Sequence, residues 1–486
     1  MTRAIMFMGT GSDVGKSLIV AGLARAFANK GLRVMPFKPQ NMSNNAAVTA
    51  DGGEIGRAQA LQARAARVHP TVHMNPILLK PETTTGAQVI VQGKRHASMT
   101  AREYFRNRHN YMGACLESFH KLADQADIVL VEGAGSPGEI NLRDGDLANM
   151  GFAEAADLPA VLIGDIHRGG VIASIAGTFD ILPPADRARL KCFMINKFHG
   201  DPDLFSEGRQ FLETHTGTPC VGIVPHFAAA RSLPAEDAVA LEDISTTTRN
   251  GVRISVLRLP RIANFDDLDP LRLEPGVTVS LVQPGEPIPA DTRLVIIPGS
   301  KSTISDLAAL RREGWDIDLM AHVRRGGLVL GLCGGYQMLG KTIGDPQGLE
   351  GPAGTVPGLG LLDVETTLLP DKTLTRIAGT HVASGAALEG YEIHLGTTHG
   401  KDCDRPFATL GGRPDGATSA SGQVMGSYLH GCFGSDEFRS KFLTSLGIQA
   451  SELRFEETVD RVLDELAAHL EANLDLHLLL SLAKEL

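Results

Sequence analysis

The sequence predicts an α/β protein built from two doubly wound parallel sheets, one in each half of the chain. Short apolar runs alternate with helical patterns, which is the order expected when helices link parallel strands. Two of the apolar runs lead into glycine-rich turns that open helices, at residues 5–17 and 328–339. A chain of 486 residues is also too long for one ordinary core, so we expect two domains.

The composition is that of a globular protein with an excess of acidic groups. Hydrophobic residues make up 43%, charged residues 21%, and the formal net charge is -10. We therefore expect neither nucleic acid nor a membrane as a partner. The six cysteines have no metal-ligand spacing and no secretory signal precedes them, which is typical of a reducing compartment. We expect a cytoplasmic protein with free thiols, and the sequence leaves a homo-oligomer open.

The first glycine-rich turn has the pattern of a nucleotide-binding loop. An apolar run at residues 5–8 leads into residues 9–17, and a helical pattern follows. Backbone N–H groups and the helix N-terminus hold phosphate oxygens in such a loop, while a lysine neutralises phosphate charge and a serine binds Mg²⁺. The first glycine lies six positions before Gly15, where the common motif has five, and a glycine turn without nucleotide is the alternative. The binding candidates are Thr10, Gly11, Gly15, Lys16 and Ser17.

Further strands in the first half end in residues suited to binding a nucleotide and its metal. Glu132 follows a predicted strand directly and is a candidate second Mg²⁺ ligand beside Ser17. Asp51, in a glycine-rich loop, is a further metal candidate, although each carboxylate could equally cap a helix or be solvated. Asn196 follows a later strand. These strands are expected at residues 32–37, 127–131, 160–164, 192–195 and 221–224.

The second glycine-rich turn places a cysteine where a nucleophile would lie. Three glycines surround Cys333 between a predicted strand at residues 328–330 and a helical pattern. A tight elbow of this kind holds its side chain over the carboxyl end of a sheet, near N–H groups that can stabilise an oxyanion. His430 follows another strand-like run, so we expect both side chains at one sheet edge. A buried structural cysteine is the alternative.

Three motifs resemble class I glutamine amidotransferases of the branch found in corrinoid amidases: GLCGGYQMLG around Cys333, YEIH at residues 391–394 and SYLHG at residues 427–431. The resemblance implies a flavodoxin-like glutaminase domain. Cys333 would attack the side-chain amide of glutamine, and His430 would act first as base and then as acid. The orienting carboxylate of commoner members does not follow His430, so the resemblance names no group that holds the imidazole. The implied oxyanion and glutamine site includes Gly299, Ser300, Gly334 and Gln337.

The first half resembles dethiobiotin synthetase and its relatives, to which the amino-terminal domains of corrinoid amidases belong. This resemblance implies ATP as the nucleotide, with Asn196 reading the adenine edge. The stretches KPQNMSNN, NKFHGD and RLPRIANFDDLDPL are similar to the cobyric acid synthases in particular. That family uses ATP, Mg²⁺ and glutamine to amidate the b, d, e and g carboxylates of adenosylcobyrinic acid a,c-diamide, a corrinoid polycarboxylate.

Two other functions stay open from the sequence. The chain could amidate other carboxylates, such as the a and c positions of the corrin, or it could be a nucleotide-switched regulatory protein. We expect an ATP-dependent domain at residues 1–230, a linker at 231–250, a glutaminase at 251–446 and a helical appendage at 447–486. A basic run is either a solvated helix face or a docking surface for a polycarboxylate. It consists of Lys94, Arg95, Arg102, Arg106 and Arg108.

Overall fold

The computed structural model describes residues 1–82, 85–234, 251–449 and 451–486, and the chain forms two compact units. The first unit comprises Met1–Ser43, Thr49–Pro234 and Val459–Leu486, and the second comprises Asn44–Val48 and Ala235–Thr458. Most of the linker predicted at residues 231–250 lies outside the described residues. The domain limits expected from the sequence stay a prediction.

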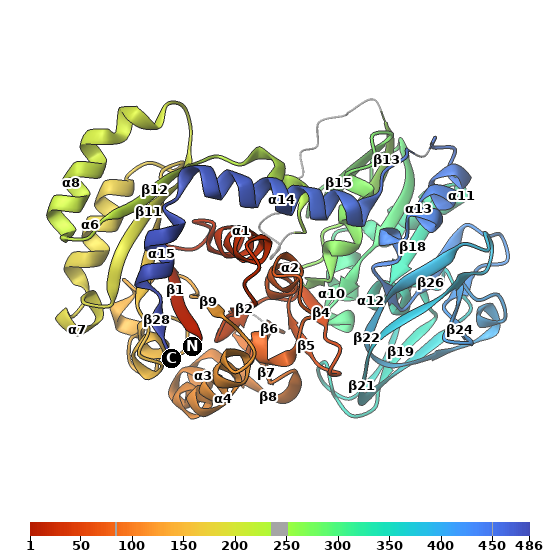
Figure 1. The fold of residues 1–486 in the computed structure, drawn as a ribbon. Helices are drawn as coiled ribbons and strands as arrows, with labels where there is room; N and C mark the ends of the chain where they lie inside the picture. Colours follow the sequence, from red (N-terminus) through yellow and green to blue (C-terminus); the bar gives the residue numbers. More distant parts are fainter. Residues whose placement is uncertain (83–84, 235–250, 450) are drawn as a thin grey trace. The chain divides into compact units, whose positions relative to one another are not determined.

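A parallel sheet forms the centre of the first unit, as the alternation of strands and helices predicts (Figure 1). Its order is β12-β11-β10-β1-β9-β2, and all of these neighbours run parallel. The strands are β1 (Arg3–Gly9), β2 (Val34–Phe37), β9 (Ile128–Glu132), β10 (Ala160–Asp165), β11 (Leu190–Phe198) and β12 (Cys220–Pro225). The main helices are α1 (Lys16–Asn29), α2 (Arg57–Ala65), α4 (Met112–Ala123), α6 (Val171–Ile181) and α8 (Ser206–Thr216).

The last part of the chain also belongs to the first unit. Strand β28 (Lys484–Glu485) pairs antiparallel with β1, so the two termini lie side by side (Figure 1). Helix α14 (Phe455–Asn473) faces Gly22 of α1 with Leu466 and Leu470. Asp460 on the same helix lies 2.6 Å from the buried guanidinium of Arg25. The leucine spacing predicts this helix, but nothing in the sequence predicts the surface on which it packs.

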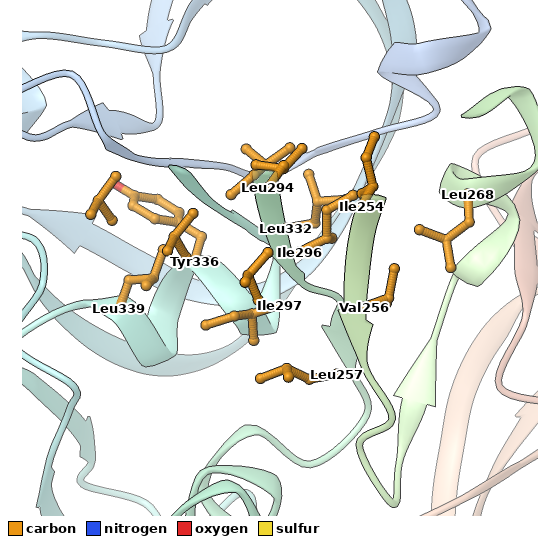
Figure 2. Close-up of a cluster of buried hydrophobic side chains, with 14 of the residues drawn as sticks. Ile254, Val256, Leu257, Leu268, Leu294, Ile296, Ile297, Leu332, Tyr336 and Leu339 are labelled. Carbon is orange, nitrogen blue, oxygen red and sulfur yellow. The ribbon is translucent and has the colours of Figure 1, made fainter. Parts of the chain in front are cut away.

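The second unit contains the other predicted parallel sheet, in the order β15-β13-β16-β18-β26, with β25 antiparallel at the edge. Figure 2 shows its buried core, in which side chains of β13 and β16 pack with Tyr336 and Leu339 of helix α12. The strands are β13 (Val252–Leu257), β15 (Val277–Val282), β16 (Thr292–Ile297), β18 (Leu328–Leu332), β25 (Ala417–Thr418) and β26 (Val424–Ser427). The helices include α10 (Thr303–Arg312), α11 (Trp315–Arg324), α12 (Gly334–Leu339) and α13 (Asp436–Ser445).

Two of the other sheets are the main additions to this predicted architecture. In the first unit, a four-stranded sheet contains β3 (Gln40–Met42), β6 (Ile77–Pro81), β7 (Gly86–Val91) and β8 (Lys94–Thr100). In the second unit, β21 (Glu365–His381) and β22 (Ala387–His399) form a long antiparallel hairpin. The register of the hairpin shifts between Thr367 and Lys372, and this break interrupts the alternation that marks a strand in sequence. Among the described helices, none has the length and apolar character needed to cross a membrane.

Candidate active site

Cys333 lies in a strained turn between β18 and α12. Its backbone has φ 52° and ψ -107°, a conformation that non-glycine residues rarely adopt and that costs about 1–3 kcal/mol. The surrounding fold holds the turn, because the Cys333 N–H donates to Ser427 O at 2.8 Å. A side chain at Gly335 would clash with the carbonyl of Ile297. The thiol donates to Ile393 O at 3.5 Å, and the residue is only 7% exposed.

His430 is the neighbour of Cys333 in this site. It belongs to β27 (Leu429–His430), which pairs with β22. Its imidazole is fully buried and stacks on the ring of Tyr391, with 5.3 Å between the ring centroids. The imidazole and the sulfur atom interact, and this contact is one of the influences on the pKa of His430. The structure therefore brings the predicted nucleophile and the predicted base together.

Asp267 is a residue of this site that the sequence analysis did not find. It lies in the 3-10 turn η7 (Phe265–Leu268), is 2% exposed, and its Oδ2 lies 2.7 Å from Nδ1 of His430. Its Oδ1 accepts the Gly431 N–H at 2.5 Å. This carboxylate holds the imidazole from the side opposite Nε2. No local pattern reveals it, because 163 positions separate the two residues.

Two influences act in opposite directions on the pKa of His430. Burial lowers it, because a buried cation loses its hydration. The charge and hydrogen bond of Asp267, together with the contact to Cys333, outweigh burial and raise this pKa to about 10. The imidazole can therefore hold a proton at neutral pH, which is the form that a general acid needs.

The predicted oxyanion residues lie against Cys333 and His430. Strand β17 (Gly299–Ser300) pairs with β14 (Ile262–Ala263), and a Cβ added at Gly299 would lie 3.0 Å from Cε1 of His430. A Cβ added at Gly334 would lie 3.0 Å from the backbone nitrogen of Ser300. A side chain at either position would require these neighbours to shift. The structure thus gathers all four predicted residues around the elbow, since Gln337 lies on α12 and its N–H donates to Cys333 O at 3.1 Å.

The side chains of Ser300 and Gln337 are engaged within the protein. The Ser300 hydroxyl donates to Oδ2 of buried Asp306 at 2.7 Å. Gln337 accepts from the Thr303 hydroxyl at 3.1 Å and donates to Leu395 O at 2.9 Å. These bonds position the loop and the helix around Cys333. A direct role of either side chain in binding glutamine stays a prediction.

The first unit gathers the predicted phosphate and metal residues at one loop. Lys16 at the start of α1 is 7% exposed, and its ammonium group donates to the carbonyls of Gly11 and Gly135. The Ser17 hydroxyl donates to Oε1 of Glu132 at 2.7 Å, and the Lys38 ammonium lies 2.8 Å from the same oxygen. A hydroxyl and a carboxylate side by side at a glycine loop fit the oxygen ligands that Mg²⁺ prefers beside nucleotide phosphates.

Asn196 contacts the phosphate loop itself. Its Nδ2 donates to Val14 O at 2.8 Å, and a side chain at Gly15 would clash with this amide. Gly15 has φ 93°, which glycine adopts without strain. In the structure Asn196 therefore supports the loop, and its predicted contact with adenine stays a prediction.

Asp51 is placed differently from Glu132. Its side chain is exposed, and Oδ2 accepts the Val72 N–H at 3.2 Å. This bond ties Asp51 to the backbone of Val72, and its role as a metal ligand stays a prediction. In the part of the chain that the structure describes, no group of three or more His, Cys, Asp and Glu side chains could hold a metal ion by itself.

The predicted basic run is divided between a strand and a helix, and one of its members is buried. Lys94 and Arg95 belong to β8, whereas Arg102 and Arg106 lie on α3 (Ala101–Asn107), whose N-terminus has a capping box of Thr100 and Glu103. Arg108 is buried, and its guanidinium donates to the carbonyls of Leu142 and Asp144. Arg108 is thus a structural residue in this structure.

Comparison with known proteins covers both units. Residues 5–239 match the family model described as "CobQ/CobB/MinD/ParA nucleotide binding domain", and residues 253–438 match that of the "CobB/CobQ-like glutamine amidotransferase domain". Proteins named cobyric acid synthase from Bradyrhizobium diazoefficiens, Cereibacter sphaeroides and Rhodobacter capsulatus are 61%, 60% and 61% identical to the chain. These similarities span 99% or more of the chain and 100% of each relative. The chain therefore belongs to the cobyric acid synthase family.

Proposed function

We propose that this protein uses ATP and glutamine to amidate the b, d, e and g carboxylates of adenosylcobyrinic acid a,c-diamide. The observation that carries the proposal is the buried arrangement of Cys333 and His430 on a strained elbow, in a chain that also has a nucleotide-binding loop. A glutaminase and a phosphate loop on one chain suit an enzyme that releases ammonia and activates a carboxylate to receive it. The full-length similarity to proteins named cobyric acid synthase supports this choice of substrate.

In the glutaminase reaction, the Cys333 sulfur attacks the amide carbon of glutamine and a thioester forms. His430 receives the thiol proton and passes it to the nitrogen as the carbon–nitrogen bond breaks, so ammonia leaves. Asp267 stabilises the imidazolium and fixes the ring, which is the task of the third member of a catalytic triad. Backbone N–H groups around Gly299 and Gly334 would bind the oxyanion. Water then hydrolyses the thioester and releases glutamate.

In the synthetase reaction, Lys16 and the loop at residues 10–15 would bind ATP phosphates, and Ser17 and Glu132 would hold Mg²⁺. The bound metal would neutralise phosphate charge. We expect the carboxylate to be activated as an acyl phosphate, because hydroxide is a poor leaving group and phosphate a good one. Ammonia attack on this carbonyl gives the amide and frees phosphate.

Mass spectrometry of the corrinoid product tests substrate and reaction together. The protein is incubated with adenosylcobyrinic acid a,c-diamide, ATP, Mg²⁺ and glutamine, and we expect four new amide groups. Amidation of the a and c positions of cobyrinic acid in a parallel reaction would instead favour the a,c-diamide synthase reaction. A protein that hydrolyses ATP but neither consumes glutamine nor changes either corrinoid would favour a nucleotide-switched regulator.

The Cys333→Ala variant separates the two half-reactions. We expect it to lose glutamine-driven amidation by at least about 1,000-fold, because no nucleophile remains. Amidation with ammonium chloride should continue near the wild-type rate, since the synthetase residues are unchanged. Cys403→Ala, at a partly buried thiol outside the elbow, is the matched control. Loss of both nitrogen sources in Cys333→Ala would contradict the assigned role.

A further inference from the structure

Glu350 caps helix α10 from another segment of the second unit. The helix begins at Thr303, and its first N–H groups need acceptors from outside the helix. Oε2 of Glu350 accepts the Ile304 N–H at 3.0 Å, and the same carboxyl group contacts the Thr303 hydroxyl. Buried Asp345 holds Glu350 in this position, because its Oδ2 accepts the Glu350 N–H at 2.8 Å. A segment distant in sequence therefore completes the N-terminus of α10.

The Thr303 hydroxyl connects this carboxyl group to the elbow. It is buried and donates to Oε1 of Gln337 at 3.1 Å. The Gln337 side chain in turn donates through Nε2 to Leu395 O of β22 at 2.9 Å. Gln337 thereby ties α12 to β22, the strand whose Ile393 carbonyl accepts from the Cys333 thiol.

The chemistry of these groups fixes where the Thr303 proton goes. Leu395 O can only accept, so Nε2 of Gln337 must face it and Oε1 must face Thr303. Oε1 is itself an acceptor in a buried amide, so it needs the single proton of the hydroxyl. The Thr303 oxygen is then left as an acceptor for the carboxyl group of Glu350. That bond requires the neutral form of Glu350, because a carboxylate has no proton to donate.

Ionisation of Glu350 changes this pattern. The carboxylate and Oε1 of Gln337 then compete as acceptors for one hydroxyl proton. The charge-assisted bond to the carboxylate is the stronger one, so the Thr303 hydroxyl turns from Gln337 to Glu350. Burial raises the pKa of Glu350 to about 7, against the hydrogen bonds that it accepts and the charge of Lys301, and the charge of Asp345 adds to the rise. Both forms of Glu350 are therefore populated near neutral pH.

We propose that Glu350 is a positioning residue of the glutaminase, which as the neutral acid holds Gln337 through the Thr303 hydroxyl. In this form Gln337 fixes β22 against the elbow that carries Cys333. The carboxylate form withdraws the Thr303 proton, and the Gln337 amide loses the donor that orients it. Glutamine must fit beside the thiol, so kcat/KM for its hydrolysis falls when Glu350 ionises. The effect on glutamine rests on the proposed function, whereas the chain of hydrogen bonds rests on contacts within the second unit.

One backbone signal reports on this chain without any substrate. Tyr336–Gln337 is the only Tyr–Gln step in the sequence, so labelling tyrosine with ¹³C at the carbonyl and glutamine with ¹⁵N gives a single coupled NMR signal. In the full-length protein, we expect its chemical shift to titrate with a midpoint near pH 7. Glu350→Gln should abolish this titration, because its amide donates to Thr303 at every pH while its oxygen accepts the Ile304 N–H. Thr303→Val should abolish it too, and Thr303→Ser should restore it.

Glutamine hydrolysis by the same samples tests the effect on the reaction. The ratio of kcat/KM in Glu350→Gln to that in the wild type should rise on the order of fivefold between pH 6 and pH 8.5, since an amide does not ionise. In the Thr303→Val background, the same substitution should give a ratio that does not change with pH. Glu313→Gln, at the other end of α10, is the matched control and should also give a constant ratio.

Two results of the titration would overturn the proposal. A Gln337 signal that behaves alike in the wild type and in Glu350→Gln would show that this carboxyl group does not control it. A titration that persists in Thr303→Val would show that the hydroxyl is not the link. A constant kcat/KM ratio in Glu350→Gln would overturn the effect on glutamine. Hydrolysis that survives in Cys333→Ala would disprove the proposed function, and the titration would still decide the role of Glu350.

Discussion

His430 shows what a sequence reveals at the scale of single residues. Cys333 and His430 lie in short patterns of glycine and apolar residues, so the sequence alone predicts both as candidates. Asp267 lies in a different segment, and only the turn between β14 and η7 carries it to Nδ1 of His430. Two other aspartates, Asp266 and Asp269, lie within two positions of it in the sequence. No pattern distinguishes the one that contacts the imidazole.

Replacement of this carboxylate tests its role in catalysis. We expect Asp267→Asn to lower kcat for glutamine hydrolysis by about 100-fold or more with little change in KM, because the ring loses its orientation and the imidazolium its partner. The pKa of His430 should fall from about 10 toward its ordinary value, so the part of the pH profile that reports its deprotonation moves to lower pH. Rates of glutamate release between pH 6 and 10 measure both effects.

Asp266→Asn is the matched control for that substitution. Asp266 accepts from the Tyr391 hydroxyl at 3.2 Å, whereas the imidazole bonds to Asp267. Its replacement should cost much less activity and leave the pH profile in place. Equal losses in the two variants would show that the turn, rather than the Asp267 carboxylate, matters.

At the scale of elements, the sequence predicted the parallel strands better than the antiparallel ones. Parallel strands such as β9 and β10 are buried along almost their whole length and form continuous apolar runs. The hairpin of β21 and β22 has an exposed face, and Pro370 and Asp371 fall at the break in its register. A strand that is half exposed and interrupted has no clear period in sequence. The sequence therefore identified residues 391–394 of β22 as a motif but did not predict the strand that contains them.

Asp306 secures the loop that precedes α10. Its Oδ2 accepts from the Ser300 hydroxyl and from the Arg261 N–H. Burial raises its pKa to about 6, against the opposing effect of these bonds. Because the folded-state pKa lies above the ordinary value of 3.8, Asp306 stabilises the fold at low pH. That contribution is lost as the pH rises through about 6.

Asp306→Asn should remove this loss of stability, because an amide does not ionise. The amide oxygen can still accept from the Ser300 hydroxyl and from the Arg261 N–H. We expect the variant to gain on the order of 2 kcal/mol relative to the wild type between pH 4 and pH 8. Urea unfolding followed by fluorescence of Trp315, the single tryptophan, reports on the second unit alone. A difference between variant and wild type that does not change with pH would contradict the assignment.

The packing of α14 on α1 gives a second prediction at this scale. A methyl group at Gly22 would lie 2.5 Å from Leu470 and 2.8 Å from Leu466, so Gly22→Ala overpacks the contact and should cost about 1–3 kcal/mol. Gly177→Ala, on α6, meets no atom within 4 Å and should be neutral or stabilise by about 0.5–1 kcal/mol. Calorimetry of both variants measures the change in stability. The unfolding of the second unit, followed by Trp315 fluorescence, should not change and serves as the reference. Equal stabilities of the two variants would show that α14 does not pack here.

At the scale of the whole molecule, each unit is assembled from segments that are distant in sequence. The first unit takes its last strand and much of α14 from the end of the chain, and the second takes Asn44–Val48 from near the beginning. Composition and periodicity identify elements but not their partners, so this exchange of segments could not be predicted. The fold class could be predicted, because it depends only on the order of strands and helices.

Two reactions on one chain lead to a final prediction about Lys16. Its ammonium group lies within the phosphate loop, so Lys16→Ala should lower amidation by at least about 100-fold with glutamine and with ammonium chloride alike. Glutamine hydrolysis depends on residues of the second unit, so basal glutamate release should survive the substitution. Lys30→Ala, at the exposed end of the same helix, should retain both activities. Product and glutamate are quantified in the same reactions, and unchanged amidation in Lys16→Ala would remove this loop from the mechanism.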